Sequence, residues 1–183
     1  SVCKWLFEVG AAADITKADN NGATPMYIAC EKDHLPVCKW LFEVGAAADI
    51  TKANNNGVTP MYIACQNGHL SVCKWLFEVG AAADITKADN NGATPMYIAC
   101  EKDHLPVCKW LFEVGAAADI TKANNNGVTP MYIACQNGHL SVCKWLFEVG
   151  AAADISKADN DGYTPMYLSL IHISEPTRQP YIS

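Results

Sequence analysis

One arrangement of metal-binding and nucleophilic side chains recurs along the chain. It is a Cys-x3-His-x3-Cys pattern, found at Cys30, His34 and Cys38; Cys65, His69 and Cys73; Cys100, His104 and Cys108; and Cys135, His139 and Cys143. Thiolates and imidazoles are zinc ligands, and a thiol activated by an imidazole is a nucleophile. The pattern therefore raises two chemical possibilities, a metal site and a covalent catalytic site.

The pattern fits neither chemistry well. A structural zinc site needs four ligands, whereas each copy supplies three, at a spacing that departs from the usual cysteine pairs. A catalytic site is normally unique, and repeated copies indicate a structural role instead. The acidic residues Asp49, Asp84, Asp119 and Asp154 recur singly and form no local acid–base pair. We therefore predict that the chain is not an enzyme, and that it has no catalytic residues, no metal site and no cofactor.

The pattern recurs because the whole chain is periodic. Thr24-Pro25 returns as Thr59-Pro60, Thr94-Pro95, Thr129-Pro130 and Thr164-Pro165, always 35 residues apart. A fixed period of this size is typical of stacked repeat arrays, in which each unit packs only on its neighbours. Residues 1–70 and 71–140 are identical. Two explanations stay open, a recent duplication or an error in assembling a repetitive nucleotide sequence.

Each period predicts a pair of short helices. In the first helix Thr24 suits the N-cap and Pro25 the first helical position, and the helix is expected to end near Lys32. Isolated helices of this length are marginal in water, so neighbouring units must cover their apolar sides. We expect four complete pairs, which begin at Pro25, Pro60, Pro95 and Pro130.

The second helix and the segment after it follow from similar signals. Pro36 opens the helix, and Gly45 stands where a helix needs a left-handed cap residue. We predict that residues 46–55 form an extended finger with turn chemistry at its tip. Between the two helices, Gly68 and Gly138 stand where other units have Asp33 and Asp103. A positive φ at this position would suit glycine and strain aspartate.

Composition limits the partners. The chain of 183 residues has 17% charged residues and a formal net charge of −6, without the basic stripe of a nucleic-acid binder. No apolar run approaches the ~20 residues that cross a bilayer, so we predict no membrane insertion. The nine cysteines fall within apolar helical patterns. Buried, reduced thiols are the favoured interpretation, which predicts an intracellular, cytoplasmic location. The tryptophans, one in each second helix, are expected in the core.

Several motifs within one unit resemble the ankyrin repeat. The segment 59–65, TPMYIAC, is similar to the family's first-helix signature, and 67–70, NGHL, to its inter-helix turn. Tyr27 and its equivalents replace the usual histidine, and each period is two residues longer, with Ala46-Ala47 as the extra pair. The resemblance covers residues 1–167. It implies an all-α solenoid of stacked helix-turn-helix units with β-hairpin-like fingers.

The repeats define the expected organisation of the chain. The array spans 1–167, with a half unit at 1–20, full units from about 21, 56, 91 and 126, and a truncated unit from about 161. Residues 168–183 leave the pattern. Within them LSLIHISEPTR, at 168–178, resembles the translation of a transposase-type sequencing-library adapter, so we predict a non-native tail. The alternative is a degenerate final unit followed by a natural tail.

The resemblance also implies a function. Ankyrin repeats are scaffolds for protein–protein interaction, and their fingers and first helices form a concave binding face. The matching positions are Asn20, Asn21, Ala23, Glu31, Lys32, Asn55, Asn56, Val58, Gln66, Asn67, Asn90, Asn91, Ala93, Glu101, Lys102, Asn125, Asn126, Val128, Gln136 and Asn137. The asparagines are equally good turn formers. Two alternatives remain, a repeat segment of a larger multidomain protein such as a kinase, or a purely structural spacer.

Overall fold

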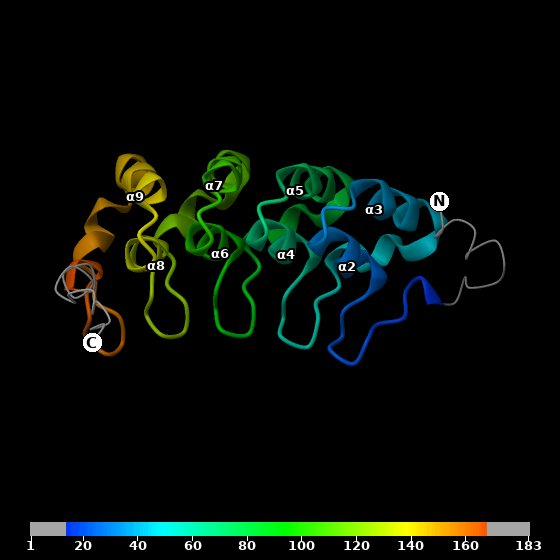
Figure 1. The fold of residues 1–183 in the computed structure, drawn as a ribbon, viewed down its shortest axis with the longest axis horizontal. Helices are drawn as coiled ribbons and strands as arrows, with labels where there is room; N and C mark the ends of the chain where they lie inside the picture. Colours follow the sequence, from blue (N-terminus) through cyan, green and yellow to red (C-terminus); the bar gives the residue numbers. More distant parts are fainter. Residues whose placement is uncertain (1–13, 168–183) are drawn as a thin grey trace, which may run out of the picture.

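The computed structural model describes residues 14–167. Its first helices are α2 (Pro25–Glu31), α4 (Pro60–Gln66), α6 (Pro95–Glu101) and α8 (Pro130–Gln136), and its second helices are α3 (Leu35–Leu41), α5 (Leu70–Leu76), α7 (Leu105–Leu111) and α9 (Leu140–Leu146). Figure 1 shows two rows of helices, with looped fingers that project away from the second-helix row. The predicted helix pairs and their starting prolines are confirmed. The interpretations of residues 1–13, including Cys3 and Trp5, and of residues 168–183 lie outside the described residues.

The first helices begin as their caps predict. In α2 the Thr24 Oγ1 accepts a hydrogen bond from the backbone N–H of Tyr27 at 3.2 Å, and Pro25 occupies the first turn. Thr59, Thr94 and Thr129 make the same bond at the same distance. The helix ends at Glu31, one residue before the position predicted from the sequence.

The turn between the two helices has the positive φ that the alternating glycines suggested. Asp33 and Asp103 have φ values of 57° and 61°, and Gly68 and Gly138 have 75°. Space matters at Gly68 as well, because an added Cβ would lie 2.6 Å from Nδ1 of His104. Glycine at this position therefore satisfies both the backbone conformation and the packing of the next unit.

The segment after the second helix differs from the prediction. It continues as a π-type turn, η2 (Phe42–Ala46), and a 3-10 helix, η3 (Ala47–Thr51). Gly45 interrupts the helical conformation with a φ of 124°. The prediction of extended backbone from Ala46 is wrong up to Thr51, because alanine is the best helix former and Ile50 anchors the turn in the core.

The same two turns follow each of the other second helices. They are η4 (Phe77–Ala81) and η5 (Ala82–Thr86), η6 (Phe112–Ala116) and η7 (Ala117–Thr121), and η8 (Phe147–Ala151) and η9 (Ala152–Ser156). Extended backbone begins at Lys52 and its equivalents. The finger closes like a hairpin, since Asn54 N–H donates to Val58 O and Gly57 N–H to Asn54 O, each at 3.0 Å. Within residues 14–167 no segment forms a β-strand.

The core runs along the array between the two helix rows. Met26, Met61, Met96 and Met131 are fully buried where consecutive first helices pack together. Trp75, Trp110 and Trp145 are also buried, and each meets a phenylalanine of the preceding unit edge to face, with ring centroids 5.9 Å apart. The predicted core role is confirmed for these tryptophans. None of the helices between residues 14 and 167 has the length and apolar character needed to span a membrane.

Candidate functional site

The Cys-x3-His-x3-Cys pattern separates into two unrelated features. Within each repeat the two cysteines face each other, with Sγ–Sγ distances of 3.7 Å at Cys30–Cys38, 3.6 Å at Cys65–Cys73 and at Cys100–Cys108, and 3.5 Å at Cys135–Cys143. All eight are free thiols. The cysteines of each pair lie on the two helices of one repeat, so they hold the helix pair together.

His69, His104 and His139 contact the preceding repeat instead of the thiols. Nε2 of His69 lies 3.0 Å from the carbonyl oxygen of Glu31, and Nε2 of His139 lies 2.8 Å from that of Glu101. Within the described part of the chain no three His, Cys, Asp or Glu side chains form a group that could hold a metal ion. Burial raises the pKa of the Cys65 and Cys100 thiols, and a protonated thiol is a poor nucleophile.

The first tip asparagine of each finger joins it to the finger before. The backbone N–H of Asn55 donates to Asn21 O at 2.9 Å, and its side-chain Nδ2 donates to Asn20 O at 3.1 Å. Asn90, Asn125 and Asn160 repeat both bonds, each to the preceding finger. We call this series the amide ladder. Asn55, Asn90 and Asn125, predicted as partner contacts, thus direct their side chains along the array.

The second tip asparagine bonds differently. Like the first tip asparagines, Asn21, Asn56, Asn91 and Asn126 are exposed, but they give the amide ladder only their backbone carbonyls. Their side-chain amides therefore face solvent in a row along the finger tips. Of the other predicted tip residues, Val58 and Val128 are partly exposed, whereas Ala23 and Ala93 are buried, at 7% and 6% exposure. The two alanines offer no contact surface, because the small side chain packs under the finger.

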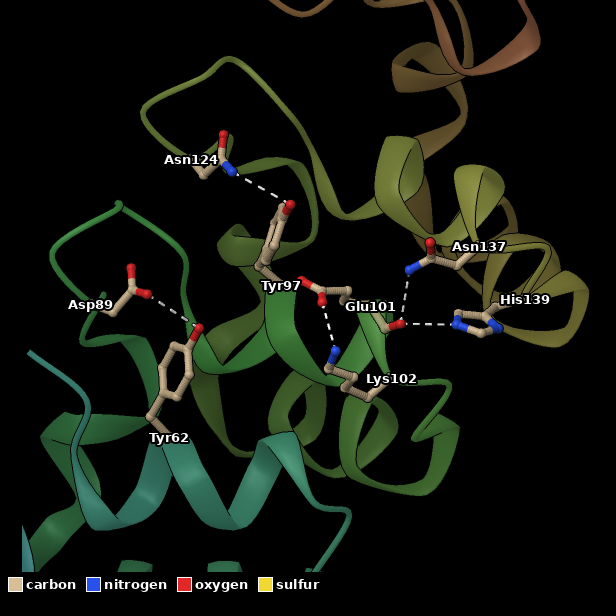
Figure 2. A network of polar contacts seen from close by, with 8 residues as sticks. All are labelled: Tyr62, Asp89, Tyr97, Glu101, Lys102, Asn124, Asn137 and His139. Atoms are coloured by element: carbon tan, nitrogen blue, oxygen red, sulfur yellow. Dashed lines mark hydrogen bonds and ion pairs between the residues drawn. The ribbon is translucent and has the colours of Figure 1, made fainter. Parts of the chain in front are cut away.

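The residues predicted as partner contacts at the ends of the first helices also have different roles, because some of them bond to the neighbouring repeat. The Nδ2 of Asn67 donates to Glu31 O at 3.0 Å, and that of Asn137 donates to Glu101 O at 3.1 Å. Figure 2 shows the second of these bonds beside the histidine contact, with the Glu101 carboxylate paired to Lys102. That ion pair measures 2.8 Å, and its equivalent between Glu31 and Lys32 measures 3.3 Å.

Lys32, Lys102 and Gln136 are exposed and Gln66 is partly exposed, and none of these four bridges to the next unit; Asn137 is also exposed, but its amide is bonded to Glu101 O. Their side chains lie at the C-terminal ends of consecutive first helices, whereas the fingers precede the N-terminal ends. We group them with the exposed tip residues under the name finger face. It comprises Asn21, Lys32, Asn56, Val58, Gln66, Asn91, Lys102, Asn126, Val128 and Gln136.

Sequence reasoning missed a contact that fixes each finger to the first helix of the preceding unit. Tyr62 Oη donates to Asp89 Oδ2 at 3.5 Å, whereas Tyr97 Oη accepts a hydrogen bond from Asn124 Nδ2 at 3.4 Å (Figure 2). Tyr132 donates to Asp159 in the same way, at 2.7 Å. Two features of the sequence could have predicted this contact. Tyrosine replaces the usual family histidine, and Asp and Asn alternate at the finger base.

These tyrosines are largely buried. Burial, with help from nearby acids, raises the pKa of Tyr27 and of Tyr132 to about 12. Their hydroxyls therefore stay protonated at neutral pH and remain available as donors. The tyrosine hydroxyls and the amide ladder hold the fingers in one register, which keeps the finger face regular along the array.

A row of antiparallel helix pairs with fingers tied tip to tip defines a helix-turn-helix repeat solenoid. A family model described as ankyrin repeats (3 copies) matches residues 1–89, 46–124, 79–159 and 117–176. The chain belongs to the ankyrin-repeat family. A comparison with curated proteins finds no match. As a class, ankyrin repeats are modules of protein–protein interaction and are typically non-enzymatic scaffolds.

Proposed function

We propose that this chain binds another protein through the finger face. The proposal rests on the different hydrogen-bonding roles of the two tip asparagines of each finger. Both are exposed, but the side-chain amide of the first is bonded in the amide ladder, whereas that of the second makes no hydrogen bond within the described residues and recurs at every 35-residue step. The turn at the finger tip does not need the side-chain amide of the second asparagine. A binding surface can use a regular row of such amides.

The chemistry of the finger face indicates what kind of partner it suits. Side-chain amides donate and accept hydrogen bonds, so they match a polar, extended segment of another protein. Lys32 and Lys102 pair with neighbouring glutamates, which leaves the face close to neutral. The face includes no Trp, Tyr or Arg, the usual residues of strong interface anchors. We therefore expect many weak, repeated contacts in place of one tight site.

We also propose that the chain is non-catalytic, uses no metal or cofactor, and acts without nucleic acid or membrane insertion. The buried, protonated thiols and the histidines engaged by neighbouring carbonyls support this proposal. Free thiols packed between the two helices of each repeat favour a reducing, cytoplasmic location. The division into units from about 21, 56, 91 and 126, with a non-native tail at 168–183, remains our proposal for the organisation of the chain.

The test uses matched variants on two faces. Proteins retained by the immobilised chain would be identified by mass spectrometry, purified, and measured against Asn56→Arg/Asn126→Arg on the finger face. The control is Lys74→Glu/Lys144→Glu, on exposed positions of the second helices. We expect affinity to fall about tenfold or more in the asparagine variant, about 1.4 kcal/mol, and to stay unchanged in the lysine variant.

Two outcomes would contradict the proposal. If the wild-type chain retains no protein above background, the structural spacer is the better interpretation. If the lysine variant loses affinity and the asparagine variant does not, the binding surface lies on the second helices. A circular dichroism spectrum of each variant establishes that the helices are intact.

A further inference from the structure

The dipeptide Asn-Gly occurs in two places in the repeat. The finger tips hold Asn21-Gly22, Asn56-Gly57, Asn91-Gly92 and Asn126-Gly127, and the turns between the helices hold Asn67-Gly68 and Asn137-Gly138. The backbone nitrogen of a glycine can attack the side-chain amide of the asparagine before it, because no Cβ hinders closure of the ring. The chain therefore places one reactive dipeptide in two structural settings.

The finger tip leaves the side chain of its second asparagine free to react. Asn56 is exposed, and within the described residues its side-chain amide makes no hydrogen bond. The amide of Asn55, by contrast, donates to Asn20 O at 3.1 Å, and the residue after Asn55 is not glycine. The Asn56 side chain can therefore turn its Cγ toward the Gly57 nitrogen without breaking a side-chain hydrogen bond.

The turn between the helices holds the same dipeptide in place. Asn67 Nδ2 donates to Glu31 O at 3.0 Å, and Asn137 Nδ2 donates to Glu101 O at 3.1 Å. The backbone N–H of Asn67 also caps the end of α4, where it bonds to Ile63 O at 3.1 Å. Ring closure at Asn67 would first have to break the side-chain bond to the preceding repeat.

The glycine nitrogen is bonded in both settings. Gly57 N–H donates to Asn54 O at 3.0 Å, and Gly68 N–H donates to Cys65 O at 3.2 Å. Attack requires the release of one such bond at either place, so this cost is common to both. The settings differ in the asparagine amide, which is free at the finger tip and bonded at the turn.

The packing of the fingers keeps glycine at the tip. Gly57 has a φ of 78°, and an added Cβ would lie 2.5 Å from Oδ1 of Asn90. Any other residue would strain the backbone and clash with the amide ladder. The contacts that form the amide ladder therefore also retain the reactive dipeptide.

We propose that Asn21, Asn56, Asn91 and Asn126 are modification sites that lose the side-chain amide as ammonia, whereas Asn67 and Asn137 are protected. A bond forms between the glycine nitrogen and the asparagine Cγ, the bond from Cγ to Nδ2 breaks, and ammonia leaves with the glycine N–H proton. Water then opens the ring to aspartate or isoaspartate. The reaction needs no oxidant, reductant or enzyme, and the proposal does not depend on partner binding.

The two products affect the finger differently. Aspartate fits the turn, because Asp161 occupies the equivalent position, where its N–H donates to Asp159 Oδ1 at 3.0 Å. Asn56 N–H makes the same bond to Asn54 Oδ1 at 2.9 Å. Isoaspartate lengthens the backbone by one carbon and displaces the Asn56 carbonyl that accepts from Asn90 N–H. Either product adds negative charge to the finger face.

The experiment incubates the full chain at mildly alkaline pH, folded and in urea, and follows deamidation by peptide mass spectrometry. Asn56 and Asn67 lie in one tryptic peptide, residues 53–74, and residues 123–144 give the same peptide, so fragment ions compare tip and turn directly. In the folded chain we expect conversion to be roughly tenfold faster at the tip, because a hydrogen bond holds the amide at the turn. In urea the two rates should be similar. An isoaspartyl methyltransferase should label the product.

The matched variant is Asn56→Gln/Asn126→Gln, which keeps an amide at both tips on a longer side chain and should stop conversion there. Asn21 and Asn91, in the peptides 18–32 and 88–102, should still convert in this variant. Circular dichroism establishes that the variant is folded. Equal rates at tip and turn in the folded chain would overturn the proposal, and so would absence of conversion at the folded tip.

Discussion

A single residue at the turn between the helices distinguishes the strained from the relaxed repeats. Asp33 and Asp103 have positive φ values, which cost an L-residue roughly 1–2 kcal/mol, whereas Gly68 and Gly138 adopt them freely. The Asp33 carboxylate lies 4.0 Å from His69 Nδ1 at an exposed site, where such a contact contributes little. The strain is therefore mostly uncompensated.

We predict that Asp33→Gly raises the free energy of unfolding by about 1 kcal/mol, because it removes this strain. The reverse change, Gly68→Asp, should lower it by more, since the new Cβ would also meet the His104 ring. Urea denaturation followed by tryptophan fluorescence measures both. Changes of the same sign in the two variants would contradict the explanation.

A second residue-scale prediction concerns the buried carboxylates. Asp84 and Asp119 are 4% and 5% exposed, and one oxygen of each has no hydrogen-bond partner. Burial raises the pKa of both carboxyls, opposed by Lys87 and Lys122 respectively. Above the unfolded pKa of about 3.9, the folded chain then holds protons that the unfolded chain has released. Their contribution to stability is largest at low pH and is lost as pH rises through the raised pKa.

Asp84→Asn/Asp119→Asn removes these titrations. We expect its free energy of unfolding to fall less than that of the wild type between about pH 4 and about pH 7. Urea denaturation at several pH values within that window gives both slopes. Lys87→Gln is the matched control, because loss of the opposing charge should raise the Asp84 pKa further and steepen the fall. Parallel curves for all three proteins would disprove the link.

At the scale of the element, the aromatic contact between units provides an internal comparison. Phe77 meets Trp110 edge to face, whereas Phe147 is 56% exposed. Residues 71–85 and 141–155 have the same sequence, so the two sites differ only in their neighbours.

We expect Phe77→Leu to lower the free energy of unfolding by about 0.5–1.5 kcal/mol through loss of the aromatic pair. Phe147→Leu should change it by less than about 0.5 kcal/mol, as exposed substitutions usually do. Chemical denaturation of both variants decides the matter. A similar cost at both positions would show that the ring acts within its own helix.

The elements that the sequence predicts well are those with local signals. Thr24 and Pro25 specify a helix start within three residues, and the exchange of Gly68 for Asp33 reports a positive φ. The 3-10 helix at Ala47–Thr51 was missed although its alanines favour helix, because the burial of Ile50 that anchors it depends on neighbouring elements. The different roles of Asn55 and Asn56 were also hidden, since they depend on the neighbouring finger. The sequence thus predicted where the candidate site lies, but not which of its residues bond to neighbouring repeats and which are open to a partner.

For the whole molecule, the identity of residues 1–70 and 71–140 allows a clean change of length. Deleting 71–140 joins Leu70 to Ser141 and recreates the sequence already present at Leu140-Ser141. We expect a folded, shorter array with a lower melting temperature and a smaller denaturant m-value, because stability in such arrays is a sum over units and their interfaces. Calorimetry and urea denaturation measure the two quantities. Unchanged values would show that the deleted units contribute nothing cooperative.

The amide ladder has a mechanical consequence. Each ladder bond joins one finger to the finger before it, and the bonds are of the same kind and similar length. A pulling force applied along the stack would therefore load a series of equivalent ladder bonds, none of which is weaker than the others. The array would therefore lengthen in equal steps, one repeat at a time, and each repeat would be able to refold once the force is released.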